Sequence, residues 1–246
     1  MNASARAVIF AGPSLPPAFR PTDWALEWRP PARQEELYQA ALTRPEIIGI
    51  IDGYFEITPT AWHKEILWAM AQGIHVYGSA SIGALRAAEL HSFGMKGVGR
   101  IFEAYRDGVL FDYDEVAVLH GPEEVGYPAV TAAMVNIRAT LDEAVAKGVL
   151  NSWLVAELTG IGKGLSYKER NWDAILRVAS GRGLPPMPLN DLRAWLPTRQ
   201  IDQKRVDALE MIAAIRAHLA TVVAPLTVSY RFRDTGYHQI AAKRFL

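Results

Sequence analysis

The chain has 246 residues, of which 50% are apolar and 21% are charged, the usage of a folded globular protein rather than a disordered or fibrous one. Its 26 basic residues balance its 26 acidic residues, so no net charge attracts nucleic acid or an anionic membrane. Cysteine is absent, which excludes disulfides, thiolate metal sites and cysteine nucleophiles.

The amino-terminal residues, Met1 to Arg6, carry neither the basic region nor the apolar stretch of a secretion signal. No apolar run of about 18 residues occurs in the chain. We therefore expect a cytoplasmic protein with no membrane partner and no nucleic-acid partner.

Four short runs rich in β-branched or aromatic residues predict buried parallel strands. They are Val8 to Phe10, Ile47 to Ile51, Ile74 to Tyr77 and Val116 to Leu119. Helices are predicted between the second and third strands, from Thr58 to Gln72, and after the third strand, from Ser79 to Phe93. The second of these is rich in small residues, which would let a helix lie close to a sheet. The alternation predicts an α/β fold in which helices flank a parallel sheet, Rossmann-like or flavodoxin-like.

The second half of the chain is predicted to be mainly helical, and we expect an α/β core region over residues 1–126 and a helical region that packs on it over residues 127–246. The predicted helices are Thr131 to Ala146, Leu150 to Leu158, Lys168 to Ala179 and Arg205 to Leu219. Ser180 to Pro188 is rich in Gly and Pro and predicts a turn or linker. Leu226 to Phe232 alternates apolar and polar residues, which indicates an edge strand or an extended arm, with a disordered tail as the alternative.

Polar side chains follow two of the predicted strands, where sites collect in parallel sheets. Asp52 and Tyr54 follow the second strand, and Ser79 and Ser81 follow the third. An unpaired carboxylate at the end of a buried strand is costly, so Asp52 should meet a helix N-terminus, an arginine or a ligand.

The segment from Ser79 to Gly83 resembles the Gly-x-Ser-x-Gly turn of hydrolases, with Ser79 in place of the first glycine. Ser81 is then a candidate nucleophile. Ser79 is the rival, because the helix N-terminus that follows suits an oxyanion. The alternative is that both serines only cap the helix.

His63 and Lys64 are the candidate bases for such a serine, since a partly desolvated lysine can lose its proton. The alternative is a packed histidine and a surface lysine. Arg86 and Glu89 stand three residues apart on a predicted helix, which indicates an ion pair, although Arg86 could instead bind an anionic tail.

No metal and no other cofactor is expected, because the six histidines lack metal-binding spacing. Gly160 to Gly164 looks like a phosphate loop but lacks the required spacing and a preceding strand, so it is interpreted as a helix-ending loop.

Several motifs occur together over roughly Ile47 to Leu141. The most specific is the Gly-x-x-Ser-x-Gly-Ala-Leu-Arg-Ala-Ala-Glu stretch from Gly78 to Glu89. The others include Asp52 to Phe55, His63 to Leu67, Phe93 to Met95, Gly97 to Gly99, Asp114 to Gly121 and Asn136 to Ala139. Together they resemble the core of TfuA-like proteins.

The resemblance implies an accessory role in thioamide formation, in which a YcaO-type ATP-dependent enzyme activates a backbone carbonyl and sulfur replaces its oxygen. One form of this role is hydrolysis of a thiocarboxylate at the C-terminus of a small ubiquitin-like sulfur-carrier protein. We assign catalysis to Ser81, Ser79, Lys64 and His63, and substrate binding to Asp52, Tyr54, Arg86 and Glu89. In this hypothesis a serine attacks the acyl carbon, Lys64 acts as base, and helix N–H groups hold the oxyanion.

The competing hypothesis is a non-catalytic subunit that docks on the YcaO enzyme and activates it, or recruits the sulfur carrier to it. Tyr54, Phe55 and Trp62 would then form a contact surface. A pocket that holds Lys64 within hydrogen-bond reach of a serine would favour the enzyme, whereas serines buried under packed side chains would favour the docking subunit.

Overall fold

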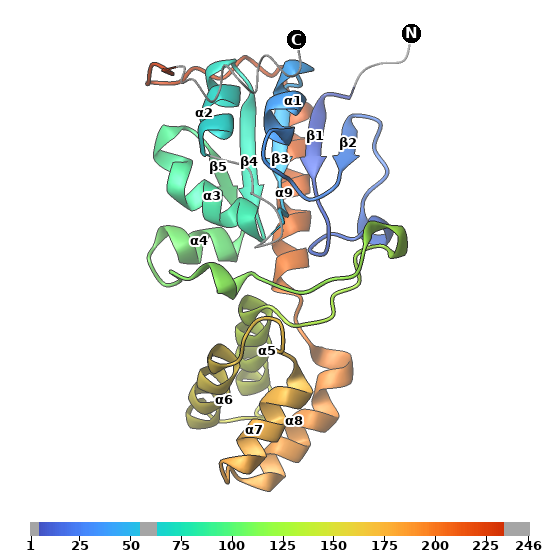
Figure 1. Cartoon of the computed structure of the whole chain (residues 1–246), viewed down its shortest axis with the longest axis vertical. Coiled ribbons are helices and arrows are strands. Elements are labelled where there is room, and N and C mark those ends of the chain that lie inside the picture. The colour runs from blue at the N-terminus through green and yellow to red at the C-terminus, as the bar shows by residue number, and fades with distance from the viewer. Residues whose placement is uncertain (1–4, 55–62, 234–246) are drawn as a thin grey trace. The chain divides into compact units, whose positions relative to one another are not determined.

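A computed structural model describes residues 5–54 and 63–233 of the chain (Figure 1). The chain divides into two compact units. The first unit comprises Met1–Phe111 with Val206–Leu246, and the second comprises Asp112–Arg205. Among the described residues, no helix has the length and apolar composition needed to cross a bilayer.

The first unit is built on a five-stranded sheet in the order β2-β1-β3-β4-β5, and every pairing is parallel. The strands are β1 (Ala7–Phe10), β2 (Leu26–Arg29), β3 (Ile47–Ile50), β4 (His75–Ser79) and β5 (Lys96–Val98). This is the flavodoxin-like order. The strand β2 lies on one side of β1 and β3 lies on the other, so the direction of the strand order reverses between β1 and β3, which is the switch point. The predicted α/β class with a parallel sheet is confirmed.

Helices cover the sheet (Figure 1). They are α1 (Glu36–Leu42), α2 (His63–Ala71), α3 (Ile82–Leu90), α4 (Arg100–Arg106) and α9 (Gln203–Leu219). Apolar side chains of α9, among them Met211, Ile212 and Ile215, share a core with Ile9 and Ile47 of the sheet. The long C-terminal helix is therefore part of the sheet's own core.

The helix α3 begins in direct backbone contact with the sheet. A Cβ atom added to Gly83 would lie 1.8 Å from the carbonyl oxygen of Ile50, and one added to Gly78 would lie 2.1 Å from the carbonyl oxygen of Gly83. Only glycine allows such an approach. The small residues of this segment therefore bring the α3 N-terminus against the carboxyl ends of β3 and β4, as the sequence predicted.

Strand prediction failed at the edges of the sheet. The predicted strand from Val116 to Leu119 is wrong, because this segment follows a 3₁₀ turn, Tyr113–Glu115, and pairs with no strand. The sequence reading missed β2 and β5. Both lie at sheet edges, where Glu27 and Lys96 reach solvent, so neither forms a continuous apolar run.

The second unit is helical. Its helices are α5 (Met134–Ala146), α6 (Ser152–Gly164), α7 (Trp172–Gly181) and α8 (Pro186–Arg199), and their apolar faces form one core. The side chains of Asn151 and Asn171 cap α6 and α7 by accepting the N–H groups of Leu154 and Ala174, at 2.9 Å and 2.8 Å. The predicted helical character of the second half is confirmed.

Two local predictions in the second unit need correction. Gly160 to Gly164 forms the last turns of α6 rather than a loop. The helix α8 was missed because the Gly- and Pro-rich segment from Ser180 to Pro188 predicted a turn or linker, whereas α8 begins at Pro186. Proline at the start of a helix costs little, since the first N–H groups have no intrahelical partner.

After α9 the chain continues as an extended arm, residues 220–233, with no strand pairing. The N–H of Leu226 donates to the carbonyl of Gly73 at 2.8 Å, and Tyr230 Oη donates to the carbonyl of Leu67 at 2.6 Å. These bonds attach the arm near the amino end of β4.

A polar cluster joins the C-terminal end of α9 to the sheet. His218 Nδ1 lies 2.9 Å from Tyr77 Oη, Lys96 Nζ lies 3.3 Å from the same hydroxyl, and the His75 ring centre is 4.6 Å from that of His218. Burial lowers the pKa of His218, the charges of Lys96 and His75 lower it further, and Glu46 partly offsets them. A neutral His218 can therefore accept a hydrogen bond from the Tyr77 hydroxyl.

We expect the stabilising contribution of His218 to be lost as the pH falls through 6.5, the ordinary pKa of histidine. Because its pKa is lowered in the folded state, the unfolded chain takes up the proton first and stability falls in acid. The free energy of unfolding of the wild type minus that of a His218→Gln variant should shrink between about pH 7.5 and about pH 5. A constant difference in urea denaturation would contradict this account.

Candidate functional site at the carboxyl ends of the strands

The carboxylate of Asp52 lies at the switch point between β1 and β3. Its Oδ2 accepts the N–H groups of Gly12 and Ser14 at 2.9 Å and 3.0 Å, and its Oδ1 accepts the Ser14 hydroxyl at 2.6 Å. The residue is 1% exposed. The carboxylate is paired, as expected, but its partner is the protein's own loop and not a helix N-terminus, an arginine or a ligand. Asp52 therefore fixes that loop rather than presenting a free carboxylate.

Ser79 is buried at the end of β4, with 0% exposure. Its Oγ lies 2.8 Å from the carbonyl of Val98 and 2.9 Å from that of Asp207. A hydroxyl has one proton to share between these acceptors, so Ser79 ties β4 to β5 and α9. This geometry gives Ser79 a structural role.

The turn from β4 to α3 is strained at Ala80. Its φ is 64°, in the left-handed region, and the N–H of Ser81 donates to the carbonyl of Ser79 at 2.7 Å, which closes a very tight turn. In the hydrolase turn the nucleophile itself occupies the strained position. Here that position belongs to Ala80, one residue before Ser81.

Ser81 precedes the first residue of α3 and is 7% exposed. Its side chain does not cap the helix, and in residues 5–54 and 63–233 its Oγ has no hydrogen-bond partner. The capping interpretation therefore fails for this serine. Ser81 remains the candidate nucleophile.

Most N–H groups at the start of α3 are already used. The N–H of Gly83 donates to the carbonyl of Ile51 at 3.3 Å, and the N–H of Ala84 donates to that of Ser81 at 3.0 Å. Among the first N–H groups of α3, that of Ile82 has no partner in the described part of the chain. An oxyanion would find at most this donor without rearrangement.

His63, Glu89 and Arg86 form a second cluster. His63 Nε2 lies 2.7 Å from Glu89 Oε2, and Arg86 donates to the same oxygen at 2.6 Å, which confirms the predicted ion pair. Burial raises the pKa of Glu89, but His63 and Arg86 outweigh this and hold it below the ordinary value. Glu89 is eight residues after Ser81, about 12 Å along the helix axis, so the pair of His63 and Glu89 is not bonded to the serine.

Lys64 is exposed. Within the part of the chain that the structure describes, it makes no hydrogen bond to Ser79 or Ser81. The guanidinium carbon of Arg33 lies over the Tyr54 ring, 4.5 Å from the ring centre. Phe55 and Trp62 lie outside the described residues. The structure thus brings together two clusters, Asp52 with its loop and His63 with Glu89, but not the proposed pair of serine and lysine.

A network of charges in the second unit escaped the sequence analysis. Arg170, with 0% exposure, donates to the carboxylate and the carbonyl of Asp114 at 2.7 Å and 3.1 Å. Lys163 also contacts Asp114, and it lies 3.0 Å from Asp112 and 3.1 Å from Glu115. Burial raises the pKa of Asp114, but Lys163 and Arg170 outweigh it and the pKa is lowered.

Two of the motifs that resemble a known family supply part of this network. Arg138 binds both carboxylate oxygens of Glu115 at 3.0 Å. Glu115 belongs to the segment Asp114 to Gly121, and Arg138 to Asn136 to Ala139. The presence of both motifs was the only sign of this network that the sequence offered. The role of Glu115 and Arg138 is to stabilise the fold of the second unit.

The flavodoxin-like sheet, the tight turn before α3 and the charge network define an α/β protein with a helical second unit. Residues 52–171 match the family model described as TfuA-like protein. Over these residues the chain is TfuA-like. This match supports an accessory role in the thioamide pathway. Comparison with curated proteins gave no match.

Proposed function

We propose that this protein is the accessory partner of a YcaO-type enzyme in backbone thioamidation of a peptide or protein, and that it supplies sulfur by hydrolysing the thiocarboxylated C-terminus of a ubiquitin-like carrier in the cytoplasm. The observation that supports hydrolysis most directly is Ser81. Its Oγ is unpaired within the described residues, beside a strained turn at the carboxyl end of the sheet. This is where parallel α/β sheets place their sites.

The chemistry needs no cysteine. Ser81 Oγ bonds to the acyl carbon, its proton passes to the sulfur, and the carbon–sulfur bond breaks with its electron pair on the leaving hydrosulfide. Water then cleaves the serine ester and restores the hydroxyl. One thiocarboxylate and one water give one carboxylate and one hydrogen sulfide.

In this scheme the substrate sulfur accepts the serine proton, which suits a serine that no base contacts. Lys64 is exposed and is available to attract the anionic tail of the carrier. His63 is bonded to Glu89. We therefore propose neither Lys64 nor His63 as the base of Ser81.

A specific observation favours the second candidate, a docking subunit that recruits the carrier or stimulates the YcaO enzyme. Ser79 is buried and bonded, and the N–H groups of Gly83 and Ala84 are taken by carbonyls. A catalytic turn keeps such donors open for the transition state. In this alternative Ser81 is dispensable.

We expect a Ser81→Ala variant to release sulfide from the thiocarboxylated carrier at least about 100-fold more slowly than wild type, because the nucleophile is gone. A Lys64→Ala variant should keep most of the rate, since no hydrogen bond joins the amine to the serine. The measurement is sulfide release with carrier mass, on the chain alone and with its YcaO partner.

The matched control is Ser166→Ala, at an exposed serine of the second unit, which should leave the rate unchanged. Full sulfide release by Ser81→Ala would remove the nucleophile from the proposal. If wild type releases no sulfide but still raises the yield of thioamide, the docking candidate replaces the hydrolase.

A further inference from the structure

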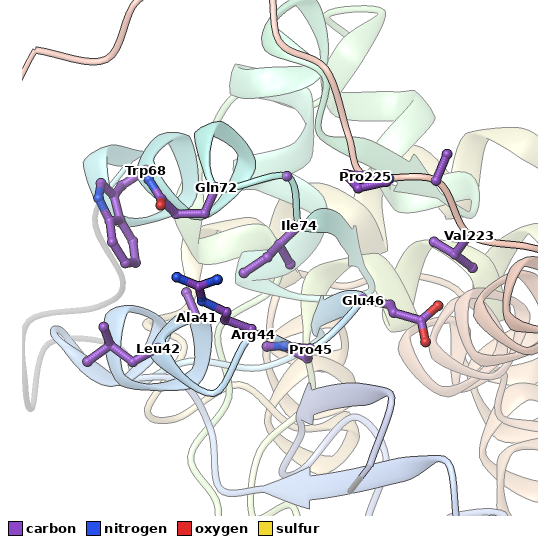
Figure 2. Close-up of a pocket in the computed structure, with 12 residues that line it drawn as sticks. Ala41, Leu42, Arg44, Pro45, Glu46, Trp68, Gln72, Ile74, Val223 and Pro225 are labelled. Carbon is purple, nitrogen blue, oxygen red and sulfur yellow. The ribbon is translucent and has the colours of Figure 1, made fainter.

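A pocket of about 470 Å³ lies at the amino ends of β3 and β4 (Figure 2), whereas Ser81 follows the carboxyl end of β4. Residues just before β3 and β4, among them Glu46 and Ile74, border it, as do α1, α2 and the C-terminal arm. Its volume is in the range of small-ligand sites. Because it lies at the amino ends of the strands, the pocket is separate from the site proposed for sulfur release.

Apolar side chains form part of the walls of the pocket. Leu42, Trp68 and Ile74 come from α1, α2 and the segment before β4, and Val223 and Pro225 come from the arm. Burying apolar groups of a ligand against such walls is favourable by about 25 cal/mol per Å². The walls therefore suit the apolar body of a ligand.

Arg44 supplies the charge. Figure 2 shows its guanidinium directed toward Trp68 and Gln72, and it has no ion-pair partner among the residues that the structure describes. The other charged residue of the lining, Glu46, is bound at both carboxylate oxygens by Arg6. The charge left for a ligand is thus one cation, which matches one anionic group and not a polyphosphate.

The backbone of Arg44 indicates that this side chain is retained at a cost. Its φ is 53°, just after the end of α1, and its N–H donates to the carbonyl of Ala41 at 3.0 Å. This is the left-handed position after a helix, which glycine fills best. An arginine there is strained, which supports a role for its side chain beyond the turn.

The arm provides an extended backbone at the edge of the pocket. The carbonyl of Ala224 is taken by His75 at 2.9 Å and the N–H of Leu226 by Gly73, whereas the N–H of Val223 has no partner in the described part of the chain. Extended peptides pair with such backbone.

We propose that this pocket binds the C-terminal carboxylate of a short apolar peptide segment. The carboxylate pairs with the Arg44 guanidinium, which can donate two parallel hydrogen bonds. The last side chain lies against Trp68 and Ile74. This inference does not depend on sulfur release or on any role of Ser81.

The test is an NMR titration of the full chain with the acetylated dipeptide Ala-Leu as free acid and, separately, as its C-terminal amide. The indole signal of Trp68, identified by its loss in Trp68→Phe, should shift with the acid at a Kd of about 1 mM. The amide should bind at least about tenfold more weakly, because it lacks the charge.

Three variants of Arg44 and one control variant sharpen the test. Arg44→Gln should weaken binding of the acid about tenfold, and Arg44→Lys should lie between it and wild type. Arg44→Gly should also lose binding, yet its thermal midpoint should equal or exceed that of wild type, because the strain is relieved. Arg193→Gln, at an exposed arginine of α8, is the matched control and should bind as wild type does.

Equal binding of acid and amide, unchanged affinity in Arg44→Gln, or no shift of the Trp68 signal up to about 10 mM acid would each overturn the proposal. A midpoint lowered by Arg44→Gly would contradict the argument from strain.

Discussion

A Gly83→Ala variant is expected to lose more than about 3 kcal/mol of stability, because overpacking against rigid backbone has no cheap relief. The added Cβ would lie 1.8 Å from the Ile50 carbonyl oxygen and 2.6 Å from its carbon. Relief requires α3 to move off β3, which also displaces Ser81. Urea denaturation followed by circular dichroism measures the loss.

The matched control is Gly160→Ala. Gly160 lies inside α6, and nothing lies within 4 Å of an added Cβ. Alanine there should raise stability by about 0.5–1 kcal/mol through helix propensity alone. If Gly83→Ala were as stable as wild type, the close approach of α3 to the sheet would be refuted.

An Arg170→Met variant is expected to lose about 3–5 kcal/mol, because the Asp114 carboxylate keeps only Lys163 as a cation and the Asp114 carbonyl loses its buried donor. Arg170 also donates to the carbonyls of Gly162 and Leu165 at 2.9 Å and 3.0 Å, and these would lose their partner. Methionine keeps much of the length of the side chain, so the loss reports polar contacts more than volume.

Arg177→Met on the exposed face of α7 is the control and should change stability by less than about 0.5 kcal/mol. Equal stability of the two variants would mean that the charge network does not hold the second unit together.

The buried part of the sheet was predictable because β1 and β3 are continuous apolar runs. The edge strands were not, since β2 is half exposed and β5 has three residues, one of them glycine. A partner strand, which the sequence does not name, decides whether such a segment is extended. The segment from Val116 to Leu119 shows the reverse case, an apolar run with no strand to pair with.

The position of the candidate site was predictable, and the roles within it were not. The sequence placed Asp52, Ser79 and Ser81 at one edge of the sheet, but not the bonds that bury Ser79. Those bonds reach Asp207, 128 residues away. Likewise, Arg170 and Asp114 are 56 residues apart, and no local spacing rule joins them.

The most direct test of the central claim is a reconstituted thioamidation. The YcaO enzyme, ATP, its peptide and the thiocarboxylated carrier are combined without this protein, with wild type, and with Ser81→Ala, and the peptide mass is followed for replacement of oxygen by sulfur. We predict that product forms with wild type, that it fails without the protein or with Ser81→Ala, and that added sulfide restores it in the Ser81→Ala reaction. The same yield of thioamide with and without the protein would contradict the account.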